Sequence, residues 1–170
     1  EATVSPATLT FTSTDWSTPK NVTVTGANDS ILDGDIDSTI TISVDADSSD
    51  DDFDELAVQE VTVTTADDDT AGFTVSETEA TVSEDGSQDT FTVVLDAQLT
   101  GSVVLNIASD DTGEATVSPA TLTFTSEDWS DTKTVTVTGA NDSILDGNAT
   151  STITISVDAD SSDDDFDELA

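Results

Sequence analysis

Cysteine, histidine, methionine and tyrosine are all absent from this chain of 170 residues. Without cysteine the chain can form neither disulfide bonds nor thiolate metal sites, and without histidine it lacks the other usual ligand of zinc and of transition metals. Nucleophilic catalysis that pairs serine or cysteine with histidine is excluded for the same reason, and we expect no enzymatic activity. The oxygen ligands that remain are those that Ca²⁺ prefers, so Ca²⁺ is the cofactor that the composition predicts.

Basic residues are almost absent as well. Lys20 and Lys133 stand against 38 acidic residues, and the formal net charge is −36. A chain this acidic repels phosphate groups, so neither nucleic acid nor an anionic membrane surface is expected as a partner. No apolar run is long enough to span a membrane and no secretion leader opens the sequence, so we expect a soluble excerpt of a longer protein, with no membrane insertion.

One part of the chain repeats another. Residues 1–57 recur as residues 114–170 at an offset of 113, and seven of these 57 aligned positions differ. A period of this length suits a whole domain rather than one turn of a solenoid, so the sequence predicts a tandem array of domains. We expect residues 1–70 to be the C-terminal part of one repeat, and residues 71–170 to be the following repeat without its last strand.

Short segments rich in Thr, Val and Ile alternate between apolar and polar residues, which is typical of strands with one buried face. The predicted strands are Val58–Thr65, Phe73–Val75, Ala80–Val82, Thr90–Leu95, Gly101–Ala108, Thr121–Thr125, Lys133–Thr138 and Ser151–Val157. Leu122, Phe124, Val135 and Val137 are expected to point inward. Trp129 and its copy Trp16 are each expected to cap the edge of a core. Seven or eight strands in about 110 residues predict an all-β fold, an immunoglobulin-like antiparallel β-sandwich.

Carboxylates gather in the segments between these strands. Three adjacent acids, Asp67, Asp68 and Asp69, join Val58–Thr65 to Phe73–Val75, and their mutual repulsion favours a bound hard cation. Further acidic loops occupy residues 28–34, 45–55, 83–86, 109–111, 141–147 and 158–168. Alternate turns of a sandwich lie at the same end, so several of these loops could converge on one Ca²⁺ site. The alternative is that the acidic turns only keep the surface soluble, as in proteins from salty habitats.

The segment TVTTADDDTAGF, residues 62–73, resembles the end of a Calx-beta domain. VSEDG at 82–86, SDDTG at 109–113 and VTGANDSILDG at 137–147 follow in the order of that family's calcium loops. The whole period is similar to the long tandem repeats of bacterial surface adhesins of the RTX type. The resemblance implies Ca²⁺ ligands in both repeats: Glu84, Asp110 or Asp111, Asp142 and Asp146 in the second, and Asp29, Asp33, Asp67, Asp68 and Asp69 in the first.

A function follows from this resemblance. It implies a calcium-stabilised structural spacer, or extender, of a secreted bacterial cell-surface adhesin, which projects a distal ligand-binding domain and supports adhesion and biofilm formation. Its partners would be neighbouring copies of the same repeat, and copies of this chain could also form a strand-exchanged homo-oligomer. Two alternatives stay open: a carbohydrate- or host-binding β-sandwich module of an extracellular protein, and a Calx-beta-type calcium sensor.

Overall fold

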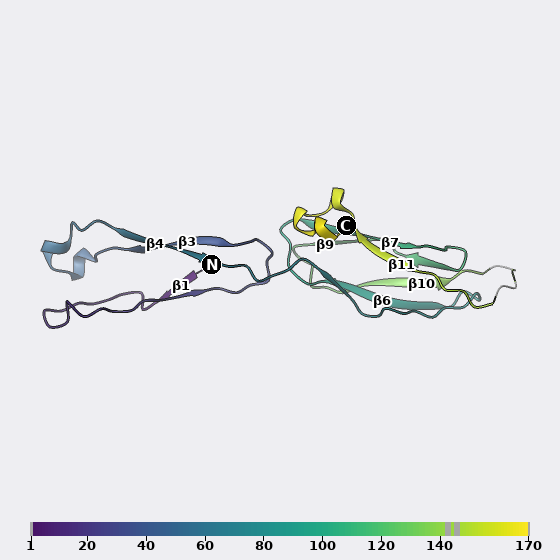
Figure 1. Ribbon diagram of the computed structural model, residues 1–170, viewed down its shortest axis with the longest axis horizontal. Coiled ribbons are helices and arrows are strands. Elements are labelled where there is room, and N and C mark those ends of the chain that lie inside the picture. The colour runs from purple at the N-terminus through teal and green to yellow at the C-terminus, as the bar shows by residue number, and fades with distance from the viewer. Residues whose placement is uncertain (1, 142–143, 145–146, 170) are drawn as a thin grey trace. The chain divides into compact units, whose positions relative to one another are not determined.

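The computed structural model describes residues 2–141, 144 and 147–169. The chain divides into two compact units. Unit 1 comprises Glu1–Asp29 and Asp33–Asp68, and unit 2 comprises Ser30–Leu32 and Asp69–Ala170. Strands make up most of the regular structure, and no helix among the described residues is long and apolar enough to cross a membrane (Figure 1).

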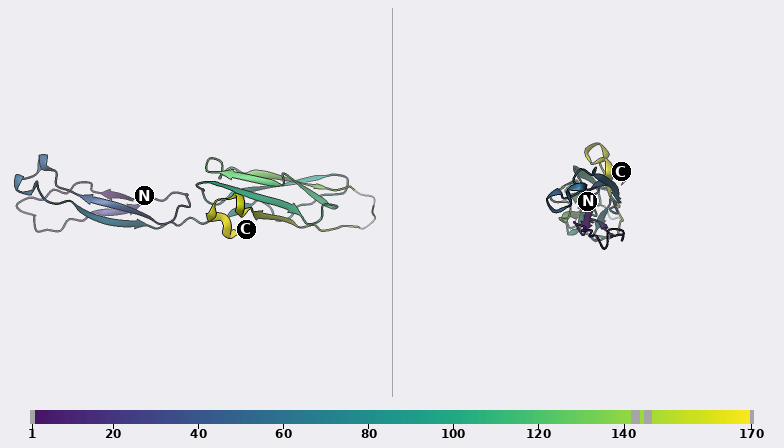
Figure 2. Two further views of the ribbon diagram at one scale, coloured as in Figure 1. Left: turned by 90° about the horizontal axis from the view of Figure 1, so that it is seen from above. Right: turned by 90° about the vertical axis from the view of Figure 1, so that its left-hand side faces the viewer.

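Unit 2 contains two antiparallel sheets that face each other in two layers (Figure 2). The first sheet has the strand order β5 (Phe73–Val75), β6 (Gln88–Leu95), β10 (Lys133–Gly139) and β8 (Ala115–Ser118). The second has the order β11 (Ile153–Val157), β7 (Ser102–Ser109) and β9 (Thr121–Thr125). Two short 3-10 helices follow β11, namely η3 (Ala159–Ser161) and η4 (Asp164–Leu169).

One apolar core fills the space between these two sheets. On β6 the side chains of Phe91, Val93 and Leu95 are buried, and the residues between them are not. This alternation arises because successive side chains of a strand point to opposite faces of the sheet. Phe124 on β9 and Phe166 on η4 are completely buried, so a strand and the segment after β11 both contribute to the same core.

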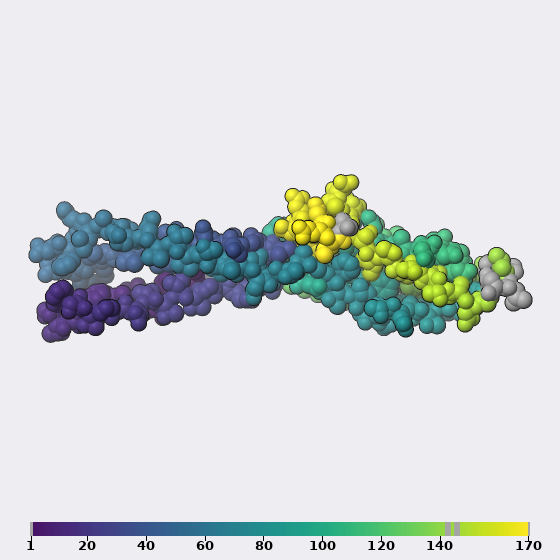
Figure 3. Space-filling view, in the orientation of Figure 1, coloured from purple at the N-terminus to yellow at the C-terminus, as the bar shows by residue number. Residues whose placement is uncertain are grey.

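Unit 1 consists of two separate strand pairs, each antiparallel. The pairs are β1 (Ala2–Ser5) with β2 (Thr23–Gly26), and β3 (Ile36–Ile42) with β4 (Gln59–Thr65); between β3 and β4 lie the 3-10 helices η1 (Ala46–Ser48) and η2 (Asp51–Phe53). The space-filling view shows an open slot between the two pairs (Figure 3). No described residue of unit 1 is fully buried, so this unit has strands but no closed core.

The prediction of an all-β fold with antiparallel pairing is confirmed. The predicted inward-facing residues Leu122, Phe124, Val135 and Val137 are buried, and Trp129 packs against the core as expected. All but one of the predicted strands lie within two residues of an observed strand. Regular alternation of Val and Thr therefore located most of the strands correctly.

Two segments differ from the prediction. The predicted strand Ala80–Val82 is wrong: the segment is a loop, in which the N–H of Thr81 donates to the carboxylate of Asp89 (2.8 Å) rather than to a neighbouring strand. Ala115–Ser118, in contrast, forms β8 and pairs with β10. This strand has four residues and ends before Pro119, so it is too short to show a clear alternation.

The duplicated sequences are buried to different degrees in the two units. Phe124 is 0% exposed whereas its counterpart Phe11 is 51% exposed, and Phe166 and Phe53 differ in the same way, at 0% and 55%. In unit 2 these positions share the core with β6 and β7, and the described part of unit 1 has no corresponding strands. Trp16 is 73% exposed, so the prediction that this copy of the tryptophan caps a core is wrong.

Candidate functional site

The first group of predicted calcium ligands meets at the end of β4. Oδ2 of Asp67 accepts hydrogen bonds from the backbone N–H groups of Asp33 (3.2 Å) and Gly34 (2.8 Å), and the N–H of Asp67 donates to Oδ1 of Asp35 (3.0 Å). Gly34 has a φ of 74°, a left-handed conformation that favours glycine. The Asp67 carboxylate thus fastens the end of β4 to the loop before β3, and two predicted ligands, Asp33 and Asp67, are brought together.

The second group lies in the loop after β7. Oδ1 of Asp110 accepts a hydrogen bond from the N–H of Thr152 (2.7 Å), and the N–H of Asp110 donates to the carbonyl of Thr152 (3.0 Å). These two bonds extend the pairing of β7 with β11 by one step. Oδ1 of Asp111 accepts from the N–H of Gly113 (2.9 Å), which closes a tight turn. Both carboxylates therefore hold the backbone of this loop.

The other predicted ligands within the described residues are Glu84, Asp29, Asp68 and Asp69. Glu84 is exposed in the turn before β6, and Asp29 is exposed in the loop after β2. Asp68 and Asp69 are neighbours in sequence, but the division between the units falls between them, so that Asp68 belongs to unit 1 and Asp69 to unit 2.

Asp142 and Asp146, the last two predicted ligands, lie outside the described residues. Among the residues that the structure describes, no group of three or more acidic side chains is placed so that it could hold a metal ion. The calcium ligands therefore stay a prediction.

Two acidic residues after β11 have surroundings that the sequence did not reveal. Oδ2 of Asp163 accepts hydrogen bonds from the N–H of Gly101 (2.9 Å) and from the hydroxyl of Thr100 (3.1 Å). Oδ1 of Asp167 is buried and has no hydrogen-bond partner within the described part of the chain. Phe166 is the sequence feature that could have identified Asp163 and Asp167. It is a single aromatic residue within an acidic run, and its burial brings the neighbouring carboxylates into the fold.

Each of the two lysines forms a small cluster with an aspartate, a phenylalanine ring and a backbone carbonyl. We call this cluster the lysine clip. In unit 2, Nζ of Lys133 lies 2.5 Å from Oδ2 of Asp128 and 4.7 Å from the centre of the Phe124 ring, and it donates to the carbonyl of Thr123. Oδ1 of Asp128 accepts from the N–H of Thr125 (2.6 Å). The clip therefore ties the turn after β9 to the start of β10.

The same clip recurs in unit 1. Nζ of Lys20 lies 2.7 Å from Oδ2 of Asp15 and 4.9 Å from the centre of the Phe11 ring, and it donates to the carbonyl of Thr10. Because both basic residues of the chain occupy equivalent positions in the repeat, five residues after an aspartate, the sequence contained a signal for this cluster. The sequence-based prediction missed it by considering the lysines only as phosphate contacts.

The clip lowers the pKa of its aspartate carboxylate in both units. The hydrogen bond from Lys133, supported by those from Thr125, lowers the pKa of Asp128 to about 2. In unit 1 the hydrogen bond from Lys20, supported by those from Thr12, holds the pKa of Asp15 far below its usual range. Both aspartates therefore stay charged at pH values below the ordinary aspartate pKa of 3.8.

A pH-dependent loss of stability should follow from the clip in unit 2. Because the pKa of Asp128 is lower in the folded state than the ordinary value of 3.8, its contribution is complete above about pH 4 and is lost as the pH falls toward 2. We therefore expect Asp128→Asn to lower the melting temperature at pH 6, and the difference from the wild type to shrink at pH 2. Calorimetry over this pH range measures both values.

Glu127→Gln is the matched control for this prediction, because it removes one negative charge from the neighbouring residue and leaves the clip intact. The pH dependence of this variant should follow the wild type. A difference between Asp128→Asn and the wild type that stays constant from pH 6 to pH 2 would contradict the role given to the ionised carboxylate.

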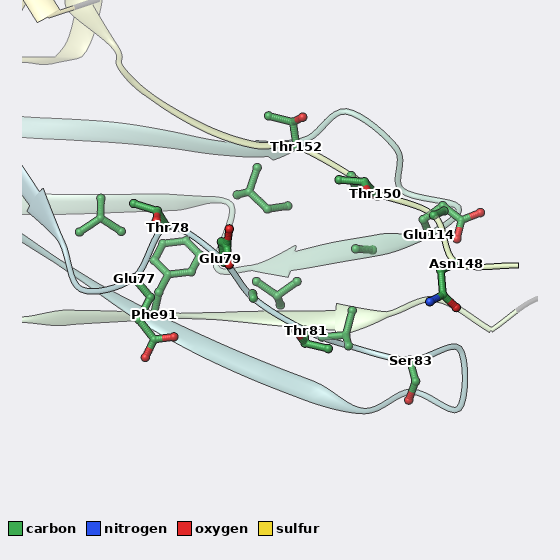
Figure 4. A pocket seen from close by; sticks show the side chains of 18 of the residues that line it. Glu77, Thr78, Glu79, Thr81, Ser83, Phe91, Glu114, Asn148, Thr150 and Thr152 are labelled. Atoms are coloured by element: carbon green, nitrogen blue, oxygen red, sulfur yellow. The ribbon is translucent and has the colours of Figure 1, made fainter.

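A groove with a volume of about 1050 Å³ lies in unit 2 between β5 and β11, the edge strands of its two sheets. Phe73 and Phe91 line it from the first sheet, and Ile153 and Ile155 line it from β11. Figure 4 shows Phe91 at this groove together with Glu77, Glu79 and Glu114. The acidic residues around it are Glu77, Glu79, Glu84 and Glu114. Threonine, serine and asparagine side chains line it as well, among them Thr78, Thr81 and Thr152, so the groove is of mixed polarity and is bordered by negative charge.

Comparisons with known proteins do not indicate a function for this chain. No family model matches the chain, and no curated protein or solved structure matches it either. Function must therefore be inferred from the internal repeat, the acidic loops and the fold.

Proposed function

We propose that the chain is part of a calcium-stabilised structural spacer, in which tandem repeats of 113 residues project a distal ligand-binding domain from a bacterial cell surface. The observation that carries this proposal is the near-identity of residues 1–57 and 114–170, which differ at seven positions. Recognition of a target needs one distinctive domain, whereas length is gained by adding copies. The resemblance to Calx-beta domains and to repeats of RTX-type adhesins supports the same function, in a secreted protein that mediates adhesion and biofilm formation.

The arrangement of unit 2 supports an immunoglobulin-like sandwich as the repeating domain. Its four-stranded and three-stranded antiparallel sheets share one core, which is the layer structure of such a sandwich. We assign residues 1–70 to the C-terminal part of one repeat and residues 71–170 to the next. In this assignment β3 and β4 of unit 1 are the last two strands of a repeat, and β11 is the counterpart of β3.

The charge balance supports Ca²⁺ as the stabilising ion. Two ammonium groups cannot neutralise 38 carboxylates, and each of the two already belongs to a lysine clip. Ca²⁺ binds oxygen ligands from several loops and backbone carbonyls, which this chain has in excess. Asp167 adds a buried carboxylate oxygen without a hydrogen-bond partner among the described residues. By removing repulsion within the acidic loops, the ion would stiffen the segments that connect successive repeats.

A sugar-binding module is the main alternative, since exposed aromatic rings often stack on sugars. Trp16 is 73% exposed, but its counterpart Trp129 packs against the core of unit 2. The exposure of Trp16 is therefore explained by the missing layer of unit 1, and it gives no independent support to a sugar site.

The acid triplet provides the test of the spacer function. Replacing Asp67, Asp68 and Asp69 together by Asn keeps their size and removes their charge. We expect the circular dichroism spectrum to stay nearly unchanged, because none of the three contributes to the core of unit 2. Small-angle scattering of the wild type should show a narrower distribution of dimensions in Ca²⁺ than in chelator, and the variant should lose this difference.

A second variant serves as the control for lost charge. Replacing Asp51, Asp52 and Asp54 by Asn removes the same number of charges from the segment between β3 and β4, and should preserve the response to Ca²⁺. If the two triple variants respond alike, or if the first one unfolds, the acid triplet does not act as a calcium-dependent connection between repeats.

A further inference from the structure

Unit 2 includes three residues that come from a distant part of the sequence. Ser30–Leu32 belong to the loop between β2 and β3, yet they pack with unit 2, whereas the residues on both sides of them in the chain belong to unit 1. The side chains of Ile31 and Leu32 are half-buried, and their neighbours at 27–30 and 33–35 are exposed. We call Ser30–Leu32 the inserted segment.

The inserted segment pairs with the turn that connects β6 to β7. Ile31 lies opposite Gln98 in a parallel bridge. The N–H of Gln98 donates to the carbonyl of Ser30 (2.7 Å), and the N–H of Leu32 donates to the carbonyl of Gln98 (3.0 Å). Both polar backbone groups of Gln98 are thus satisfied by the inserted segment, which joins the turn as a short added strand joins the edge of a sheet.

Leu32 adds an apolar contact to these two hydrogen bonds. Its side chain packs against the core of unit 2, the same cluster to which Leu95 and Leu99 belong. Ile31 and Leu32 are the only large apolar residues of the sequence between positions 27 and 35, which otherwise contains three aspartates. Because the removal of apolar surface from water is favourable, Leu32 stabilises the inserted position.

The turn that receives this segment is held in place by the rest of unit 2. Ala97 and Leu99, on either side of Gln98, are 0% and 2% exposed. Nε2 of Gln98 donates to the carbonyl of Ser126 (3.2 Å). A turn that is already fixed loses little conformational freedom when a segment pairs with it, so this turn is suited to bind a short segment.

The inserted segment is part of the repeat. Residues 28–34 have the same sequence, NDSILDG, as residues 141–147, so each repeat carries one copy of it. In the proposed division at residue 70, Ser30–Leu32 belong to one repeat and Gln98 belongs to the next. Such a contact joins two different surfaces, so it can recur between every pair of successive copies along an array.

We propose that Ser30–Leu32 is the docking segment of one repeat and that the turn at Ala97–Leu99 is its receptor in the following repeat. The partner of this turn is therefore a neighbouring copy of the repeat in the same chain. Backbone hydrogen bonds and one leucine form the contact, so it requires no metal ion. This inference rests on the proposed tandem spacer, and it adds the residues by which one repeat binds the next.

Disulfide trapping tests this contact in the whole chain, which contains no cysteine of its own. Ile31→Cys with Gln98→Cys places two thiols at opposite positions of the bridge, within the reach of a disulfide. Mild oxidation should remove the free thiols and give a monomer whose intact mass shows one internal disulfide. Asn28→Cys with Gln98→Cys is three residues, or about 10 Å, out of register and should be oxidised at least about tenfold more slowly. Equal rates, or cross-linked dimers alone, would overturn the proposal.

Hydrogen exchange measures the same contact without a cross-link. The carbonyl of Ser30 protects the N–H of Gln98, so Leu32→Asp, which places a charge against the core, should speed exchange of this amide by at least about tenfold. Leu9→Asp makes the same change at an exposed leucine of unit 1 and should alter that exchange by less than about twofold. Equal exchange of the Gln98 amide in the two variants would contradict the docking segment.

Both measurements are made in Ca²⁺ and in chelator, which separates this inference from the calcium-dependent spacer. The internal disulfide should form at the same rate in the two conditions. If it forms in register while scattering shows no response to Ca²⁺, the calcium-dependent spacer is contradicted and the docking segment stands. If scattering responds to Ca²⁺ while the two double variants are oxidised equally, the docking segment alone is contradicted.

Discussion

Removing Ca²⁺ with a chelator should lower the melting temperature of the chain by about 10 °C or more. One site at a hundredfold excess of Ca²⁺ over Kd stabilises the native state by about 2.7 kcal/mol when the unfolded chain does not bind the ion. In a domain of about 100 residues, each kcal/mol shifts the melting temperature by about 4–8 °C. Differential scanning calorimetry in CaCl₂ and in chelator measures this shift.

The control for this experiment is a sample in which NaCl replaces CaCl₂ at the same ionic strength. It is needed because screening alone weakens the repulsion among the 38 acidic residues. If NaCl reproduces the stabilisation, or if the melting curves in CaCl₂ and in chelator coincide, specific calcium binding is contradicted. An acidic surface adapted to salt would then be the better explanation of the composition.

The substitution Phe124→Ala should destabilise unit 2 by about 3–5 kcal/mol, because it removes a completely buried ring and leaves a cavity. The chain provides a matched control at the equivalent position of the repeat. Phe11→Ala removes the same ring from a site that is 51% exposed, and should cost less than about 1 kcal/mol. Urea denaturation of both variants measures the difference.

This comparison is well balanced because both rings have the same neighbour. The ammonium group of a lysine lies 4.7 Å from the centre of the Phe124 ring and 4.9 Å from that of Phe11, so the loss of the cation–π contact cancels. The remaining difference in the free energy of unfolding between the two variants therefore measures the effect of burial in the core. Equal destabilisation by the two substitutions would show that Phe11 is buried in solution, and would contradict an open unit 1.

Local sequence patterns were sufficient for most of the fold. On β9 and β10 apolar residues alternate with threonine, and this period of two both locates the strands and identifies their buried face. This sequence pattern gives the wrong prediction where contacts between residues distant in the chain determine the structure. Ala80–Val82 has the composition of a strand, yet Asp89 accepts the hydrogen bond of Thr81 and keeps the segment in a loop. The burial of Phe11 and Phe124 differs although their sequence neighbours are the same, because it depends on strands far away in the chain.

The candidate site was less predictable than the fold. A carboxylate in a loop can bind a metal ion or can accept hydrogen bonds from backbone N–H groups, and both roles favour the same residues at the same turns. Asp67 was predicted from the acid triplet, and Asp110 or Asp111 from the resemblance to Calx-beta calcium loops. The backbone groups that these carboxylates hold became visible only in the folded chain. Asp128 was overlooked because its partner, Lys133, was considered in isolation.

The lysine clips also affect how readily proteases can cleave the chain. Enzymes of the trypsin type cut after lysine or arginine and must draw that side chain into a deep acidic pocket. This sequence offers them two positions, Lys20 and Lys133, and both ammonium groups are already held by an aspartate and a backbone carbonyl. Cleavage at either position has to wait until the clip opens. In this chain the two lysine clips are therefore the sites that this class of protease can attack, and each is protected while its clip is closed.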